Sequence, residues 1–206
     1  VGTLLVAIAM MNTLAWAAAL YYLIHSTLIA AAFYLFCGWM TFQRGVFKDH
    51  LKVAPRIKQQ KTAALTYFII ALMMAGLPPF SGFFGKVFIL QATAGTAYQA
   101  WIIAIILIVS LLSILAFTRV GFILFWRASP PEDDPNQTAY RTYEALPDRA
   151  PKRNDIAIYT ILAGLMAYVV FAAPIQRYTF ATVQQIQNHA LYNQVILKTD
   201  AQDRAI

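Results

Sequence analysis

Five apolar stretches occupy most of this 206-residue sequence and limit how it can fold. Four of them reach the roughly 20 residues that a helix needs to cross a bilayer core of about 30 Å. They lack the alternation of apolar and polar residues that is typical of membrane β-barrel strands. The sequence therefore predicts an all-α, polytopic transmembrane helix bundle with four full spans and one partial span. The stretches cover residues 1–11, 13–42, 62–94, 100–126 and 156–174.

Composition agrees with a membrane protein and argues against other classes. Hydrophobic residues make up 60% of the chain and charged residues 12%, which is far from the balance of a soluble domain. The net charge of +7 does not indicate a nucleic-acid partner, because the basic residues gather in particular loops. The lipid bilayer is the expected surrounding instead. Cys37 is the single cysteine, which excludes an internal disulfide and a cysteine-based metal site.

Basic residues also predict the orientation in the membrane. The connection after the second stretch is strongly basic, with Asp49 as its one acidic residue, whereas residues 93–99 carry no charge. Because short basic loops stay in the cytoplasm, this connection and the proline-rich, acidic loop at residues 128–154 are expected there. Residues 175–206 are then expected outside. The basic residues are Arg44, Lys48, Lys52, Arg56, Lys58 and Lys61, followed by Arg127, Arg141, Arg149, Lys152 and Arg153.

Lys86 lies inside the third apolar stretch, where a charge needs a physical reason. A lysine at the bilayer centre costs at least about 2.5 to 3.5 kcal/mol and normally faces a polar cavity. Prolines and glycines precede it, and the stretch at residues 62–94 is too long for one straight crossing. A broken helix explains both observations, since the freed carbonyls and amides can face the same cavity. The residues assigned to this break are Gly76, Pro78, Pro79, Gly82 and Gly85.

Two interpretations of this break remain open, a packing kink and a path for protons. Proline and glycine are frequent in membrane helices, which favours the kink. The nearby Lys86 favours the path, because none of the acidic residues lies in the middle of a span and desolvation disfavours the charged form of a lysine. A sodium or other metal site is incomplete here, since hard cations need several oxygen ligands and the segment offers Ser81 and main-chain carbonyls.

His25 lies in a polar cluster in the second stretch, followed by Ser26 and Thr27. Histidine exchanges its proton near neutral pH, which suits a relay that includes these hydroxyls and Ser81. The alternative is a structural histidine that hydrogen-bonds a neighbouring helix. Arg119, near the cytoplasmic end of its stretch, either snorkels to the interface or acts as a gate.

The residues after 174 change character and predict a weakly amphipathic helix on the outer surface. Contact with a neighbouring subunit and passive attachment to the interface explain this pattern equally well. Its apolar residues are Ile175, Val183, Ile186, Ala190 and Leu197.

Four short segments combine into a specific pattern, YYLIHSTL at residues 21–28, GLPPFSGFFGK at residues 76–86, SLL at residues 110–112 and LFWR at residues 124–127. Up to Ala173 the chain resembles the D-type subunits of the Mrp-type multisubunit cation/proton antiporters, a family that shares its fold with the antiporter-like subunits of respiratory complex I. The resemblance implies a secondary transporter subunit, without cofactor and not an enzyme. It would lie in the plasma membrane with other membrane subunits and exchange Na⁺ or K⁺ for H⁺.

The resemblance also implies positions and roles. The chain would be a piece of a protein with fourteen helices, with helices ten to fourteen in residues 1–174 and an extracytoplasmic tail in residues 175–206. Lys86 would match the terminal lysine of the family's central hydrophilic axis, and His25 the histidine that leads toward it. The family's glutamate and lysine pair and a further lysine belong to earlier helices, so this chain alone could not contain a complete pathway.

Two other functions remain open. An antiporter-like, proton-pumping subunit of a redox-driven complex, such as an NADH-quinone oxidoreductase or a membrane hydrogenase, would have similar pump residues. A structural membrane scaffold, in which Lys86 pairs with an acid of a neighbour, belongs to a different class.

Overall fold

The computed structural model of the chain describes residues 2–48, 50–51, 57, 59–127 and 152–188. Every regular element in these residues is a helix, so the predicted all-α fold is confirmed. The predictions for Asp49, Lys52, Arg56, Lys58, Arg141, Arg149, Ala190 and Leu197 lie outside the described residues. The elements are α1 (Gly2–Ala9), α2 (Thr13–Gln43), the 3-10 turn η1 (Gly45–Phe47), α3 (Gln60–Ala75), α4 (Ser81–Ala92), α5 (Gln99–Gly121), the π-helical turn η2 (Phe122–Trp126), α7 (Lys152–Val170) and α8 (Ala172–Gln187).

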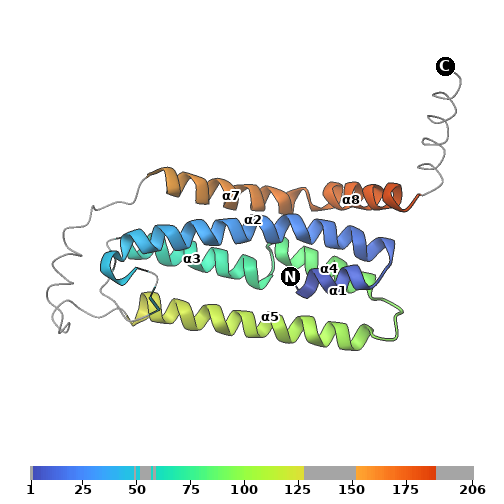
Figure 1. Ribbon diagram of the computed structural model, residues 1–206, viewed down its shortest axis with the longest axis horizontal. Coiled ribbons are helices and arrows are strands. Elements are labelled where there is room, and N and C mark those ends of the chain that lie inside the picture. The colour runs from blue at the N-terminus through green and yellow to red at the C-terminus, as the bar shows by residue number, and fades with distance from the viewer. Residues whose placement is uncertain (1, 49, 52–56, 58, 128–151, 189–206) are drawn as a thin grey trace, which may run out of the picture.

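Helix α2 is the central element of the bundle. It packs against α3 and α4 on one side and against α7 and α8 on another, and α1 covers its N-terminal part (Figure 1). Helix α5 packs against α3 and α4 at the periphery of the bundle. Segments that are distant in sequence therefore meet around α2, which brings residues of α2, α3, α4 and α5 to one place.

The number of long spans differs from the sequence-based prediction of four. Among the described residues, two helices, Thr13–Gln43 and Gln99–Trp126, are long and apolar enough to cross a membrane, and the pair α7 and α8, bent by 80°, can form a third. The difference arises because the stretch at residues 62–94 is divided into α3 and α4. The last helix also bends at Phe171, so α8 begins before the predicted tail. Pro174 lies in the first turn of α8, where a backbone N–H would have no hydrogen-bond partner within the helix, so proline is tolerated there.

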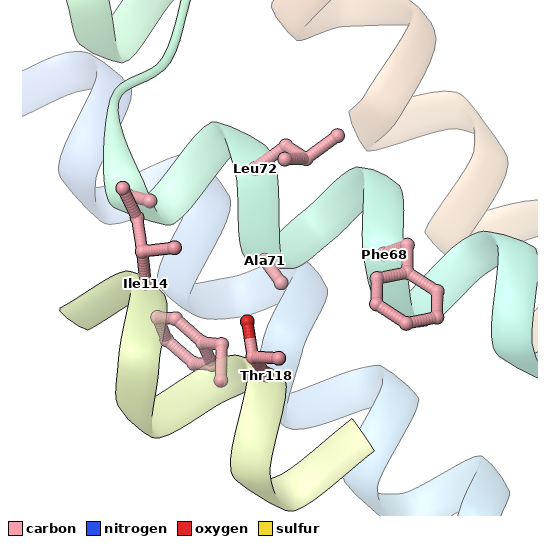
Figure 2. Close-up of a pocket in the computed structure, with 7 residues that line it drawn as sticks. Phe68, Ala71, Leu72, Ile114 and Thr118 are labelled. Atoms are coloured by element: carbon pink, nitrogen blue, oxygen red, sulfur yellow. The ribbon is translucent and has the colours of Figure 1, made fainter. Parts of the chain in front are cut away.

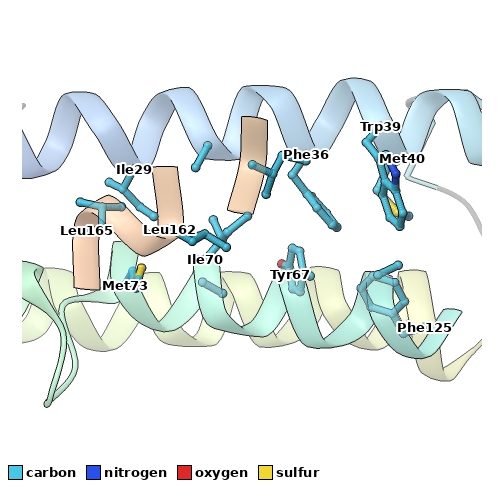
Figure 3. Packing of buried hydrophobic residues seen from close by; sticks show 14 of the residues in the cluster. Ile29, Phe36, Trp39, Met40, Tyr67, Ile70, Met73, Phe125, Leu162 and Leu165 are labelled. Atoms are coloured by element: carbon cyan, nitrogen blue, oxygen red, sulfur yellow. The ribbon is translucent and has the colours of Figure 1, made fainter. Parts of the chain in front are cut away.

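Aromatic and aliphatic side chains of α2, α3, α7 and η2 form the main core (Figure 3). The ring of Tyr67 is central, with ring centroids 5.9 Å from Phe36 and 5.6 Å from Phe125. Its hydroxyl donates to the carbonyl of Phe117 over 2.8 Å and so connects α3 to α5. Since lipid is as apolar as the core, close packing and such interhelical hydrogen bonds stabilise the bundle.

Side-chain hydrogen bonds connect the helices at the two ends of the bundle. At one end, which we call the basic end, α2 and η2 finish while α3 and α7 begin (Figure 1). There Gln43 donates to Gln59 over 3.0 Å and Gln60 donates to the carbonyl of Phe125 over 2.6 Å. At the opposite end, Asn12 caps α2 and donates to the carbonyl of Ala92. Both basic connections predicted from the sequence therefore start from the same end of the bundle.

Candidate functional site

The break between α3 and α4 covers Gly76 to Phe80 and has a defined hydrogen-bond pattern. Gly76 adopts a left-handed conformation with φ of 73°, its N–H donates to Met73, and the N–H of Leu77 donates to Leu72. This is the Schellman pattern by which glycine ends a helix. Pro78 and Pro79 lie in the break, where they interrupt no helical hydrogen bond.

Gly82 and Gly85 differ from their sequence-based assignment, because both lie inside α4 and not in the break. They serve close packing instead. A Cβ atom at Gly82 would lie 2.7 Å from both Nε2 of His25 and the carbonyl oxygen of Met73. At Gly85 it would lie 2.7 Å from Cδ2 of Tyr22. Glycine at these positions lets α2 approach α4 closely.

Lys86 extends from α4 to two other helices. Its Nζ donates to the carbonyl of Ala75 over 2.6 Å and to Oγ of Ser110 over 2.8 Å. The carbonyl of Ala75 is among the last four of α3 and has no partner within that helix. The C-terminal end of a helix also carries partial negative charge, which favours a cation. The end of the broken helix thus provides Lys86 with a hydrogen-bond acceptor and with partial negative charge, in place of a carboxylate.

His25 binds the same helix end from the other side. Its Nδ1 lies 2.8 Å from Oγ of Ser81, and its ring also hydrogen-bonds the carbonyl of Met73. Nε2 and that carbonyl oxygen both border Gly82. A neutral imidazole donates from one nitrogen and accepts at the other, so Nε2 donates to Met73 and Nδ1 accepts the proton of Ser81. His25 is 2% exposed and Ser81 is fully buried.

The end of α3 therefore brings the two titratable side chains together. His25 binds the carbonyl of Met73 and Lys86 binds that of Ala75, and the two side chains interact electrostatically. Both are hydrogen-bonded to a serine hydroxyl from a further helix segment, Ser81 or Ser110. Each of the two side chains is therefore bound to one main-chain carbonyl, which only accepts, and to one hydroxyl, which can donate or accept.

Three other candidates do not reach this site. The hydroxyls of Ser26 and Thr27 donate to the carbonyl of Leu23 over 3.0 and 2.9 Å, so they are satisfied within α2. Arg119 is exposed on α5, between Ser110 and the basic end. Ser110 was not among the candidates from the sequence. The available signal was a hydroxyl in the middle of an otherwise apolar stretch, where membrane helices favour groups that hydrogen-bond across helices.

Two cavities lie near these elements. The smaller, of about 40 Å³, lies between α3 and α5 and is lined by apolar side chains, the Lys86 acceptor residue Ala75, and Thr118 (Figure 2). It can hold about one water molecule. The larger, of about 290 Å³, lies at the basic end, where Arg44 and Lys48 line it beside aromatic and aliphatic side chains. Neither cavity is lined by Lys86 or His25. The oxygen atoms that bind Lys86 are too few for a hard cation, which takes six or more.

The close approach at Gly82 leads to a stability prediction. Gly82→Ala should lower the yield and thermal stability of the protein, because the added Cβ meets a backbone oxygen that cannot move freely; such overpacking costs roughly 1 to 3 kcal/mol. Gly164→Ala is the matched control, since Gly164 lies in α7 with nothing within 4 Å of the added atom. We expect the control to be neutral or slightly stabilising. Equal yields and equal unfolding temperatures for both variants would contradict the packing role of Gly82.

Comparison with known proteins places this site within one family. Residues 1–114 match the family described as NADH:quinone oxidoreductase/Mrp antiporter, transmembrane, and this match includes His25, Ser81, Lys86 and Ser110. The D-type subunit of the Na⁺/H⁺ antiporter of Alkalihalophilus pseudofirmus is 29% identical over 198 residues, which cover 96% of this chain and 38% of that protein. Its counterpart in the Na⁺/H⁺ antiporter of Bacillus subtilis is 33% identical over 147 residues, covering 71% of this chain and 29% of that protein.

A further relative names another cation. The D-type subunit of the probable K⁺/H⁺ antiporter of Rhizobium meliloti is 28% identical over 153 residues, with 61% of this chain and 28% of that protein covered. The chain spans less than two fifths of the length of each of these relatives. The resemblance to the D-type antiporter subunits that the sequence motifs indicated is thus confirmed. The chain belongs to the NADH:quinone oxidoreductase/Mrp antiporter transmembrane family.

Proposed function

We propose that this chain is a proton-translocating part of a Na⁺ or K⁺/H⁺ antiporter subunit, in which protons move along Lys86 and His25. The observation that carries the proposal is the binding of both side chains to the C-terminal carbonyls of the broken helix α3. The names of the relatives support cation/proton exchange as the activity. The chain then acts as a transporter subunit and not as an enzyme, together with other membrane subunits in the plasma membrane.

Lys86 can couple proton uptake to a change in its own contacts. When protonated, its ammonium donates charge-assisted hydrogen bonds to Ala75 and Ser110, and these bonds are stronger than those of a neutral amine. Loss of the proton weakens both bonds and frees the side chain to turn away from the end of α3. The protonation state of Lys86 thereby determines whether it connects α3, α4 and α5.

His25 supplies the adjacent step. The hydrogen bond from the Ser81 hydroxyl holds Nδ1 as an acceptor, so the ring can take a proton there while Nε2 keeps its bond to Met73. Burial and the like charge of Lys86 would disfavour the resulting imidazolium, whereas the negative end of α3 would favour it. Because the chain spans less than two fifths of its relatives, the remaining steps belong to residues outside it.

The test is reconstitution of the full-length protein with its partner subunits in liposomes. A Na⁺ or K⁺ gradient should drive proton movement, detected with a pH-sensitive dye inside the vesicles. Exchange with either cation supports the proposal and identifies the substrate. Absence of exchange in vesicles that contain the intact complex would overturn it.

A subunit of a redox-driven complex is the second candidate, because the family includes NADH:quinone oxidoreductase subunits. The same Lys86 and His25 contacts would serve a pump of that kind. Copurification separates the two candidates, since a redox complex brings iron–sulfur or flavin subunits with it. Their absence from an active, purified complex would exclude this alternative.

The proposed orientation leads to a topology prediction. The basic end should face the cytoplasm, because lysine and arginine orient short loops. In a Cys37→Ala background, Lys48→Cys at the basic end should react with an impermeant maleimide only in inside-out vesicles. Thr96→Cys, exposed in the uncharged connection at the opposite end, should react in intact cells. The opposite labelling pattern would reverse the orientation.

A further inference from the structure

Ser110 is a polar residue of α5 that faces the site. Its surroundings on α5 are apolar and exposed, including Leu107, Ile108, Leu111 and Leu112. Its hydroxyl accepts a hydrogen bond from Nζ of Lys86 over 2.8 Å and donates one to the carbonyl of Ile106 over 2.8 Å. Ser110 is thus the residue through which α5 contacts the charge of Lys86.

A hydroxyl at this position suits both protonation states of Lys86. Toward the ammonium, which has donors only, Oγ acts as an acceptor and keeps its own proton on Ile106. Toward the neutral amine, which has a lone pair, the hydroxyl can rotate and donate its proton to Nζ. The carbonyl of Ile106 loses a side-chain partner in that state but keeps its place in the helix. Alanine offers neither of these two bonds.

We infer that Ser110 is a positioning residue that holds Lys86 against the end of α3 and sets the pH range over which Lys86 exchanges its proton. The inference rests on the proposed function and extends it, because it assigns a role to a helix other than the two that contain Lys86 and His25. The structural observations behind this inference are the hydrogen bonds from Lys86 to the Ala75 carbonyl and to the Ser110 hydroxyl.

The other titratable groups near Lys86 are on helices that pack against α4. His25 of α2 interacts with it electrostatically. Among the remaining described groups, Tyr168 of α7 donates to the carbonyl of Tyr21, Tyr67 of α3 donates to Phe117, and Arg119 of α5 is exposed. Apart from Lys152 and Arg153 at the start of α7, whose side chains are outside the described part, the further titratable side chains on these helices are Tyr21, Tyr22, Tyr34, Cys37, Lys61, Asp155 and Tyr159. None of these seven hydrogen-bonds Lys86.

The experiment measures antiport against pH in inside-out vesicles that contain the full-length protein and its partner subunits. Ser110→Ala removes an acceptor of the ammonium and so disfavours the charged form of Lys86. The pH of half-maximal activity should therefore move to lower values by about one unit, since one hydrogen bond to a charged group corresponds to roughly that shift. Ser110→Thr keeps the hydroxyl and should restore the wild-type profile.

Ser113→Ala is the matched control. Ser113 lies one turn further along α5, is half-buried like Ser110, and donates to Val109 without contacting Lys86. Its replacement should leave the profile unchanged. Should Ser110→Ala fail to accumulate, Ser110→Cys takes its place, because the thiol has a similar volume and is only a weak acceptor. Activities are compared at equal amounts of assembled complex.

A displaced profile for Ser110→Ala or Ser110→Cys, with wild-type profiles for Ser113→Ala and Ser110→Thr, supports the inference. Wild-type profiles for all four variants, while Lys86→Ala is inactive, would overturn the role of Ser110 and leave the proposed function intact. Full activity of Lys86→Ala would instead overturn the proposed function itself. A displacement equal in Ser113→Ala and Ser110→Ala would contradict the inference, because it would reflect a general effect on α5.

Discussion

Lys86→Ala is expected to abolish cation-coupled proton flux while the complex still assembles. The substitution leaves the buried Ala75 carbonyl without its donor, which costs about 1 to 3 kcal/mol, whereas the half-buried Ser110 hydroxyl keeps its bond to Ile106. Removal of a lysine from membrane depth also removes the free-energy cost of placing its charge there, roughly 2.5 to 3.5 kcal/mol. These opposing terms are similar in size, so the loss should be in transport and not in assembly. Antiport in inside-out vesicles, at matched amounts of complex, measures it.

Lys86→Arg distinguishes a proton carrier from a structural charge. Arginine keeps the positive charge and can donate to Ala75 and Ser110, but it does not release its proton in proteins. A relay therefore predicts that the arginine variant is as inactive as the alanine variant. If Lys86 serves only as a structural charge, the arginine variant should show the same antiport activity and complex yield as the wild type. Lys61→Ala, an exposed lysine at the start of α3, controls for the loss of a lysine as such. Normal antiport in Lys86→Ala would contradict the relay.

The fold class is predictable because long apolar stretches without strand alternation leave few alternatives to membrane helices. The number of long spans is less predictable, since composition does not reveal where a stretch breaks. The pair of prolines indicates the break near Gly76, but its end is set by local geometry. Gly82 is of a residue type that is common in helix breaks, but it lies inside α4. Its close contact with His25 depends on the packing of α2 against α4, which the sequence does not reveal.

For the candidate site, too, the sequence indicates some residues, while others depend on how the helices pack. Lys86 and His25 stand out in sequence because polar titratable groups are rare in apolar stretches. Their partners depend on the register between helices, which one sequence does not reveal. Ser26 lies beside His25 in sequence yet bonds its own helix, whereas Ser81 and Ser110 approach from elsewhere in the chain. Ser113, in the same apolar stretch as Ser110, also bonds its own helix, so proximity in sequence and isolation in an apolar stretch are both insufficient to identify the partners.

Replacement of His25 should separate proton transfer from packing. We expect His25→Ala and His25→Phe both to reduce antiport well below the wild-type rate, on the order of tenfold or more, because general acid–base groups contribute about that much or more. Phenylalanine keeps a ring beside Ser81 but cannot take a proton. His25→Lys should retain part of the activity, since a desolvated lysine also titrates.

A purely structural histidine predicts a different order for these variants. His25→Gln would then preserve activity, because glutamine can accept from Ser81 and donate to Met73. His25→Lys would disrupt assembly by burying a charge at the contact with Gly82. Ser26→Ala is the matched control on α2, since the Ser26 hydroxyl bonds the carbonyl of Leu23 and does not reach Lys86 or Ser81 among the described residues, and it should behave as wild type. Antiport and complex yield measured together decide between the two roles, and full activity of His25→Phe at normal yield would remove His25 from the proton path.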